Sequence, residues 1–213
     1  MKTPKSDPQR LLRYTPFERA NHWLSALTFL LLALSGLVFF QPLYYPLSAL
    51  FGGGTWTRIL HPFIGVAMTV SFGIMFFNYR RSNLLTPTDR AWLKHVGQLV
   101  DGDESGMPES GKFNGGQKLL FWLLVGCMLV LILSGIVIWR AWFSFLFPVT
   151  LIRLCAVLHA LAATVIIALI LFHIYAAIWT KESIDAMLYG WVRKAWAKQH
   201  HAAWFRETTG GGK

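Results

Sequence analysis

The stretch 157-VLHALAATVIIALILFHIYAAIW-179 is apolar almost throughout, yet it contains two histidines, His159 and His173. It is long enough to cross a bilayer, which takes about 20 residues of α-helix. On such a helix the two side chains share one face and lie roughly 21 Å apart along the axis. Ionisable groups within a span usually face the bundle interior and have a partner there. A hydrogen bond between helices would explain a single histidine, but it explains two at opposite depths less easily.

The composition of the whole chain agrees with a membrane protein. Of its 213 residues 54% are hydrophobic and only 14% are charged, which is too apolar for an ordinary soluble domain. The formal charge of +10 does not indicate nucleic-acid binding, because the basic residues cluster just outside long apolar runs and no nucleic-acid-binding motif is found.

Four apolar runs are predicted to span the membrane, at about 23–40, 59–79, 119–139 and 151–180. The predicted fold is an all-α membrane protein, a four-transmembrane-helix bundle with a C-terminal cytoplasmic amphipathic segment. Residues 1–22 are predicted to be a cytoplasmic N-terminal tail, and 181–213 a cytoplasmic C-terminal tail.

The distribution of Lys and Arg predicts the orientation of the bundle. Both tails and the loop between the second and third spans are rich in basic residues, whereas 41–57 has none and 140–150 has only Arg140. By the positive-inside rule, both termini and the middle loop are expected on the cytoplasmic side.

The tails and the cysteines predict less specific features. The N-terminal segment is too long and too rich in charge and proline for the start of a signal peptide, and is expected to be retained. Tryptophans alternate with basic residues over 183–206, which predicts an amphipathic helix on the cytoplasmic membrane face, with a solvated tail as the alternative. Cys127 and Cys155 are too few for an iron–sulfur cluster, which needs about four thiolates, and are expected to be structural.

Depth in the membrane suggests partners for the two histidines. His61 begins the second span near the outer surface, and His22 begins the first span near the cytoplasmic surface. The predicted pairs are therefore His61 with His159 and His22 with His173. Two stacked bis-histidine pairs suit two b-type haems, because each iron takes two neutral imidazoles. A proton relay or a zinc site is a weaker explanation, since zinc needs more ligands.

Short matches between the two halves of the chain support this pairing. Ser35-Gly36 and Ser134-Gly135 each follow a tryptophan at the same spacing, and the next span contains a Leu-His pair in both halves. Such a repeat would place His61 and His159 at matching depth. The glycines would admit a flat macrocycle or pack helices closely.

The other histidines are not predicted to be ligands. His95 lies in the middle loop, and His200 and His201 lie in the basic C-terminal tail. All three are expected to face solvent or lipid headgroups.

The chain resembles the cytochrome b (gamma) subunit of membrane-bound respiratory formate dehydrogenase. The resemblance covers nearly the whole chain in order, and it is carried by the motifs RYTPFERANHW, RILHPFIGV, KFNGGQK, SGIVIWR, LHA, FHIYAAIW and GWVRKAWAKQHHAAWFRE. The family's haem-ligand pattern agrees with His22, His61, His159 and His173.

The resemblance implies partners and an electron path. In the family, a molybdenum or tungsten subunit oxidises formate, and an iron–sulfur subunit with a membrane helix passes electrons to the outer haem. The electrons then reach the cytoplasmic haem and a quinone, either menaquinone or ubiquinone. This chain would be a subunit of a formate:quinone oxidoreductase in the bacterial inner membrane, with no formate site of its own. Whether the complex forms a higher oligomer stays open.

The resemblance also implies a quinone site in the segment 112-KFNGGQK-118. The family's Asn and Gln beside the quinone correspond to Asn114 and Gln117, and Gly116 between them is a further predicted residue of the site. This chain has Phe113 where the family usually has tyrosine. Amide N–H groups suit a quinone carbonyl, and Gly115 and Gly116 would allow the ring to approach the backbone. The alternative is that Asn114 only caps the following helix.

Two other functions are weighed. The cytochrome b subunit of a membrane-bound nickel–iron hydrogenase shares the four-span plan with two haems, but the tail motif WAKQHHAAWFRE favours formate dehydrogenase. A transporter or channel would contain no haem.

Overall fold

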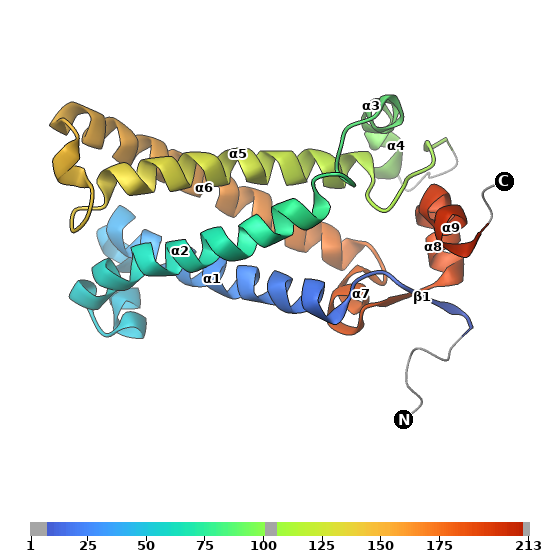
Figure 1. The fold of residues 1–213 in the computed structure, drawn as a ribbon, viewed down its shortest axis with the longest axis horizontal. Coiled ribbons are helices and arrows are strands. Elements are labelled where there is room, and N and C mark those ends of the chain that lie inside the picture. Colours follow the sequence, from blue (N-terminus) through green and yellow to red (C-terminus); the bar gives the residue numbers. More distant parts are fainter. Residues whose placement is uncertain (1–7, 101–105, 211–213) are drawn as a thin grey trace. The chain divides into compact units, whose positions relative to one another are not determined.

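The computed structural model describes residues 8–100 and 106–210, so the two ends of the predicted tails and part of the middle loop lie outside the description. Four long helices dominate it, α1 (Pro16–Phe40), α2 (Gly54–Tyr79), α5 (Gly115–Ile138) and α6 (Val149–Trp179) (Figure 1). All four are long and apolar enough to cross a membrane. The predicted helical membrane fold is therefore confirmed.

The remaining elements are short. They are β1 (Arg10–Leu12), η2 (Pro42–Phe51), α3 (Pro87–Lys94), α4 (Val96–Val100), η3 (Ser144–Leu146), α7 (Ser183–Tyr189), β2 (Trp191–Arg193), α8 (Lys194–His200) and α9 (Ala202–Thr209).

Helix α1 begins earlier than its hydropathy predicts because a capping box starts it. The Thr15 backbone N–H donates to the Glu18 carboxylate at 2.7 Å, and the Glu18 N–H donates to the Thr15 hydroxyl at 3.2 Å. Pro16 occupies the first helical position, where its missing N–H costs nothing. The first helix therefore has 25 residues and is not the short span that the sequence predicts.

The chain divides into two compact units, and the first comprises residues 20–77 and 124–172. Its apolar core consists of Met68, Met128 and Ile166, contributed by α2, α5 and α6, with Phe29 and Leu32 of α1 packed against them. The four helix segments therefore form one bundle around this core.

Small polar side chains fill the tightest positions of this unit, and large apolar side chains cover its outside. Ser35, Thr57 and Ser71 are almost completely buried, whereas Val157 and Leu133 are 67% and 64% exposed. Ser25 and Ser71 share a hydrogen bond of 2.6 Å between α1 and α2. Small residues and interhelical hydrogen bonds at the contacts, with apolar groups outside, are typical of helices that pack in lipid.

The second unit comprises residues 8–19, 78–123 and 173–210 as far as the structure describes them. Strands β1 and β2 pair antiparallel within it (Figure 1), and Leu11 lies opposite Val192. Val192, Trp196 and Trp204 form a buried cluster with Ala186 and Ala197. The N-terminal and C-terminal tails are therefore folded together.

The prediction of one amphipathic segment over 183–206 is wrong in its secondary structure. The segment breaks into α7, β2, α8 and α9. Gly190 ends α7 in a left-handed conformation with φ of 91°. Its carbonyl then accepts hydrogen bonds from the backbone N–H groups of Arg13 and Tyr14, at 2.8 and 3.2 Å. This pairing with a distant segment is not visible in a local amphipathic pattern.

Candidate functional site

The structure brings His61 and His159 together in the first unit. His61 lies on α2 and His159 on α6, and both side chains are half-buried. Their ring centres are 6.3 Å apart, with the ring planes inclined at 64°. The two residues that the sequence pairs by depth are thus neighbours.

Two serines hold these imidazoles, and the sequence alone did not reveal this role. Ser35 Oγ lies 2.7 Å from His61 Nδ1, and Ser134 Oγ lies 2.9 Å from His159 Nδ1. Each serine belongs to the Ser-Gly pair of the internal repeat, which was the available signal. The adjacent glycines leave room for the rings, because a Cβ at Gly36 or Gly135 would lie 3.7 or 3.4 Å from the Cε1 of its histidine.

The distance between the rings fits one metal ion between them. A metal–imidazole bond is about 2 Å long. The ring centres of His61 and His159 are 6.3 Å apart, a separation that leaves room for one metal ion between two imidazole rings. Since the serines occupy the Nδ1 atoms, the Nε2 atoms are the ones available to an iron. His61 and His159 therefore fit the axial ligands of a haem.

His22 and His173 belong to different units, and each is described by itself. His22 lies on α1, with its ring centre 5.4 Å from that of Trp23 in an edge-to-face arrangement. His173 lies on α6, and both histidines are half-buried. Their pairing as ligands of a second haem stays a prediction.

Asn114 and Gln117 form a reciprocal cap at the start of α5. The Gln117 N–H donates to Asn114 Oδ1 at 2.9 Å, and the Asn114 N–H donates to Gln117 Oε1 at 3.0 Å. The cap that the sequence analysis kept as an alternative is therefore present. It uses only the amide oxygens, so the two NH₂ groups still suit a ligand's acceptor.

Both amides also line a cavity of about 690 Å³ in the second unit. Its wall includes aromatic and polar side chains of the middle loop, the end of α6 and α8, among them Trp92, Trp179, Lys181, Gln199 and His200. The cavity is within the size range of small-molecule sites. The contribution of the C-terminal tail to its wall was not predicted.

The two glycines beside these amides have a packing explanation. A Cβ at Gly115 would lie 2.8 Å from the Asp89 carbonyl oxygen, and one at Gly116 would lie 3.1 Å from the Trp92 ring. The two glycines were expected to let a quinone ring approach the backbone. In the structure the indole of Trp92 occupies that position.

His201 contradicts the expectation that the three remaining histidines face solvent or headgroups. It is only 3% exposed. One ring nitrogen lies 2.7 Å from the Gly111 carbonyl oxygen, and the other lies 3.3 Å from Arg13 Nη2. Burial and the nearby Arg13 charge lower the pKa of His201 to about 3. His201 is therefore a neutral structural residue between the tails and the middle loop.

His95 and His200 are half-buried rather than fully exposed. His95 Nδ1 lies 2.8 Å from the Ala91 carbonyl oxygen at the end of α3. The His200 ring lies against Trp196, with ring centres 5.3 Å apart.

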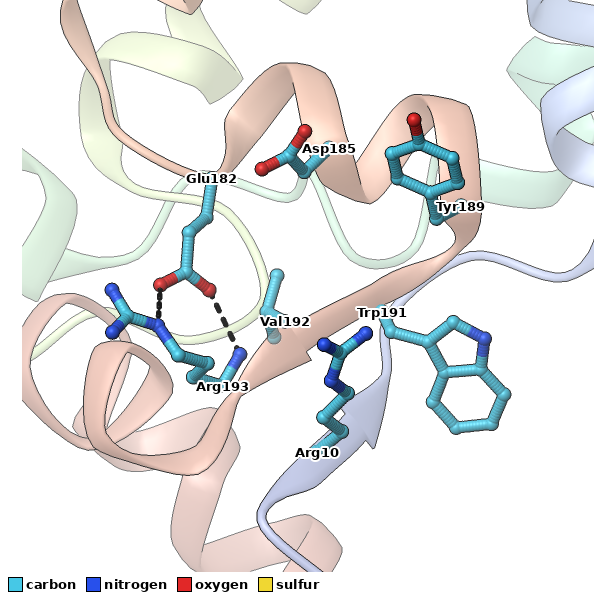
Figure 2. A pocket seen from close by; sticks show the side chains of 7 residues that line it. All are labelled: Arg10, Glu182, Asp185, Tyr189, Trp191, Val192 and Arg193. Carbon is cyan, nitrogen blue, oxygen red and sulfur yellow. Dashed lines mark hydrogen bonds and ion pairs between the residues drawn. The ribbon is translucent and has the colours of Figure 1, made fainter. Parts of the chain in front are cut away.

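A second cavity, of about 350 Å³, lies beside the two-stranded sheet and contains both charge signs (Figure 2). Arg193 forms an ion pair with Glu182 there, and its backbone N–H donates to the same carboxylate at 2.8 Å. Arg10, Asp185 and Tyr189 complete much of the wall. The charges of Glu182 and Arg193 neutralise each other, so we assign no ligand to this cavity.

The chain is similar to known cytochromes over most of its length. Residues 13–190 match the family described as prokaryotic cytochrome b561. The formate dehydrogenase cytochrome b556(fdo) subunit of Escherichia coli K12 is 45% identical over 197 residues, which are 92% of each chain. The nitrate-inducible formate dehydrogenase cytochrome b556(Fdn) subunit of the same strain is 38% identical, over 95% of this chain and 93% of that protein. The formate dehydrogenase cytochrome b556 subunit of Haemophilus influenzae is 36% identical, over 95% and 85% respectively.

Proposed function

Because the chain belongs to the prokaryotic cytochrome b561 family, we propose that it is the cytochrome b membrane anchor of a formate dehydrogenase complex and holds two b haems. The observation that carries the haem assignment is the facing pair His61 and His159, with ring centres 6.3 Å apart. The formate dehydrogenase relatives, aligned over more than nine-tenths of this chain, support the assignment to that complex. A bound haem b supplies a one-electron carrier.

The proposed electron path crosses the membrane from the outer to the cytoplasmic side. His61 and His159 hold the haem that accepts electrons from an iron–sulfur subunit in the periplasm. His22 and His173 hold the second haem, near the quinone. This chain is then a subunit of an oxidoreductase complex whose formate site lies in a partner.

The proposed orientation places both termini in the cytoplasm of a bacterial inner membrane. It rests on the basic residues of the two tails and the middle loop, against the almost uncharged connections 41–57 and 140–150. Alkaline phosphatase fused after Lys213 is expected to be inactive, and green fluorescent protein fused there is expected to fluoresce. The reverse pattern would refute this orientation.

The proposed quinone site is the cavity lined by Asn114 and Gln117. The amide NH₂ groups of these residues donate to a quinone oxygen, while their oxygens keep the cap of α5. Gly116 contributes to this site because it has no Cβ, so the Trp92 ring can pack against it and line the same cavity. The polar wall offers protons a path from the cytoplasm, and quinone reduction takes up two.

A haem assay on the purified complex tests the central part of the proposal. The pyridine haemochrome of the parent complex is expected to show about two b haems per chain, because the four histidines supply two imidazoles to each iron. His159→Ala is expected to remove one haem and leave the one at His22 and His173. One or no haem in the parent complex would refute the proposal.

Reduction by different donors distinguishes the proposed complex from the hydrogenase alternative. Formate is expected to reduce both haems of the purified complex, and hydrogen gas is expected to reduce neither. The opposite result would identify a hydrogenase subunit and reject the assignment to formate dehydrogenase.

A further inference from the structure

We propose that Ser35 and Ser134 are positioning residues that fix the Nδ1–H tautomer of His61 and His159 and thereby tune the reduction potential of the haem between them. The inference rests on the proposed haem site. It adds two residues that touch neither the iron nor a substrate and act through the histidine ligands.

The two serines make the same pair of contacts. Ser35 Oγ lies 2.7 Å from the Leu31 carbonyl oxygen, four residues back on α1, and 2.7 Å from His61 Nδ1. Ser134 Oγ lies 2.5 Å from the Val130 carbonyl oxygen on α5 and 2.9 Å from His159 Nδ1. One arrangement thus occurs once in each half of the chain.

The direction of each hydrogen bond follows from counting protons. A serine hydroxyl has one proton and two lone pairs, and a carbonyl oxygen can only accept. The hydroxyl proton therefore goes to the helix carbonyl, and the imidazole must donate its Nδ1–H to the serine oxygen. A neutral imidazole with its proton on Nδ1 has its lone pair on Nε2. Both histidines are thus prepared to bind a metal through Nε2.

Burial makes these two hydroxyls difficult to replace. Ser35 has no exposed surface and Ser134 is 3% exposed, so water has little access to the Nδ1 atoms when a hydroxyl is removed. A donor left without an acceptor in a low-dielectric interior is costly. The His61 imidazole would then turn or tilt, or keep an unsatisfied N–H, whereas the Leu131 backbone, which also bonds the His159 ring, offers that ring a second acceptor.

The hydrogen bond also changes how strongly the imidazole donates to iron. A ligand histidine becomes more basic when its other N–H donates to an acceptor. A more basic axial ligand stabilises ferric iron relative to ferrous iron and so lowers the reduction potential. Removing either serine hydroxyl is therefore expected to raise the potential, and removing both is expected to raise it further.

The experiment uses the complete complex purified from membranes, with Ser35→Ala, Ser134→Ala and the double variant. Haem content is measured first, followed by optical redox titration and electron paramagnetic resonance of the ferric haems. Thr28→Val is the matched control, because Thr28 is also buried on α1 and its hydroxyl bonds the Leu24 carbonyl oxygen at 2.8 Å. The same hydroxyl also lies 3.1 Å from the Ser25 carbonyl oxygen and 3.2 Å from the sulfur of Met68. Ser134→Thr is a second control, because threonine keeps a hydroxyl on the same Cβ.

We expect the alanine variants to keep both haems, with a raised potential and altered resonance positions for one haem only. Thr28→Val and Ser134→Thr are expected to match the parent. If an alanine variant loses one haem while Ser134→Thr and Thr28→Val keep both, the positioning role is also supported. Unchanged potentials and resonances in a double variant with full haem content would overturn the inference, as would equal shifts in Thr28→Val. A His61→Ala complex that keeps both haems would instead refute the haem site itself.

Discussion

Gly190 forms the left-handed turn between α7 and β2 in the C-terminal tail. Its φ is 91°, and a Cβ there would lie 2.7 Å from the Tyr14 carbonyl oxygen. Gly190→Ala therefore combines a strained backbone with a steric clash, which is expected to cost about 1–3 kcal/mol. The expected result is faster proteolysis of the tail after Thr180 in the purified complex.

A second glycine provides the control for this prediction. Gly97 lies in helix α4, and a Cβ there would meet nothing within 4 Å. Gly97→Ala is expected to leave the rate of proteolysis at the tail unchanged. Equal sensitivity of the two variants would show that the left-handed turn at Gly190 does not hold the tail.

His201 is expected to make the second unit less stable in acid. Its pKa is lowered to about 3, first by burial and then by Arg13, whereas an unfolded histidine has a pKa of about 6.5. Between these values the unfolded state binds the additional proton, so the free energy of unfolding falls as pH falls from about 6.5 toward 3. Above that window the contribution of His201 is fully present.

A variant without a titrating ring tests this pH dependence. His201→Gln retains a donor for the Gly111 carbonyl and an acceptor for Arg13, the two partners of the imidazole. The slope of unfolding free energy against pH is expected to decrease by about one proton in that window. Identical slopes in parent and variant would contradict the assignment of acid sensitivity to His201.

At the scale of elements, a buried ion pair joins α3 to α5. Lys118 Nζ lies 2.8 Å from Asp89 Oδ2, and the two side chains are only 10% and 8% exposed. Burial alone would raise the pKa of Asp89, but hydrogen bonds from Lys118 and Thr86 hold it below its ordinary value. Asp89 also caps α3, accepting from the Thr86 N–H at 2.7 Å.

Asp89→Asn is expected to destabilise the second unit by about 3–5 kcal/mol, because it leaves the Lys118 charge buried without a counter-ion. Thermal unfolding of the purified complex measures this loss. The control is Glu109→Gln, which removes an exposed ion pair with Arg206 and is expected to change little. If both variants lose similar amounts of thermal stability, burial of the Asp89–Lys118 pair does not explain the destabilisation by Asp89→Asn.

Hydropathy predicts where the four spans lie but not where their helices begin. Thr15 with Glu18 and Asn114 with Gln117 form caps before α1 and α5, so both helices start in polar sequence that hydropathy excludes. The Thr15–Glu18 pattern was visible in the sequence without being recognised as a helix start, whereas the cap at Asn114 was predicted as an alternative to a quinone contact. The pairing of β1 with β2 had no such local signal, because it joins segments at opposite ends of the chain.

At the scale of the whole molecule, depth along the spans was enough to pair His61 with His159. It required only helix rise and span direction, both of which are readable from sequence. The roles of Ser35 and His201 were not readable in this way, because they depend on which atoms a rotamer brings within hydrogen-bond distance. For the same reason, the sequence did not show that α8 lines the same cavity as Asn114.

At the end of the proposed electron path, the amide NH₂ groups of Asn114 and Gln117 donate hydrogen bonds to the quinone. Asn114→Asp and Gln117→Glu, made together, retain the side-chain oxygens that cap α5 but replace the two NH₂ donors with acceptors. Each hydrogen bond lost to a quinone oxygen is worth about 1 kcal/mol, so the affinity for quinone is expected to fall roughly 10- to 100-fold. Formate-driven reduction of both haems is expected to remain, while turnover with added quinone falls and its KM rises.

Asn114→Ala with Gln117→Ala completes this comparison, because it removes both the donors and the cap. If the amides bind quinone, the acidic pair and the alanine pair are both expected to lose quinone-linked turnover, and only the alanine pair loses helix stability. If the amides are only a cap, the acidic pair keeps normal turnover and the alanine pair alone is impaired. Steady-state quinone reduction and thermal unfolding, measured on the same preparations with both haems intact, therefore separate a ligand site from a helix cap.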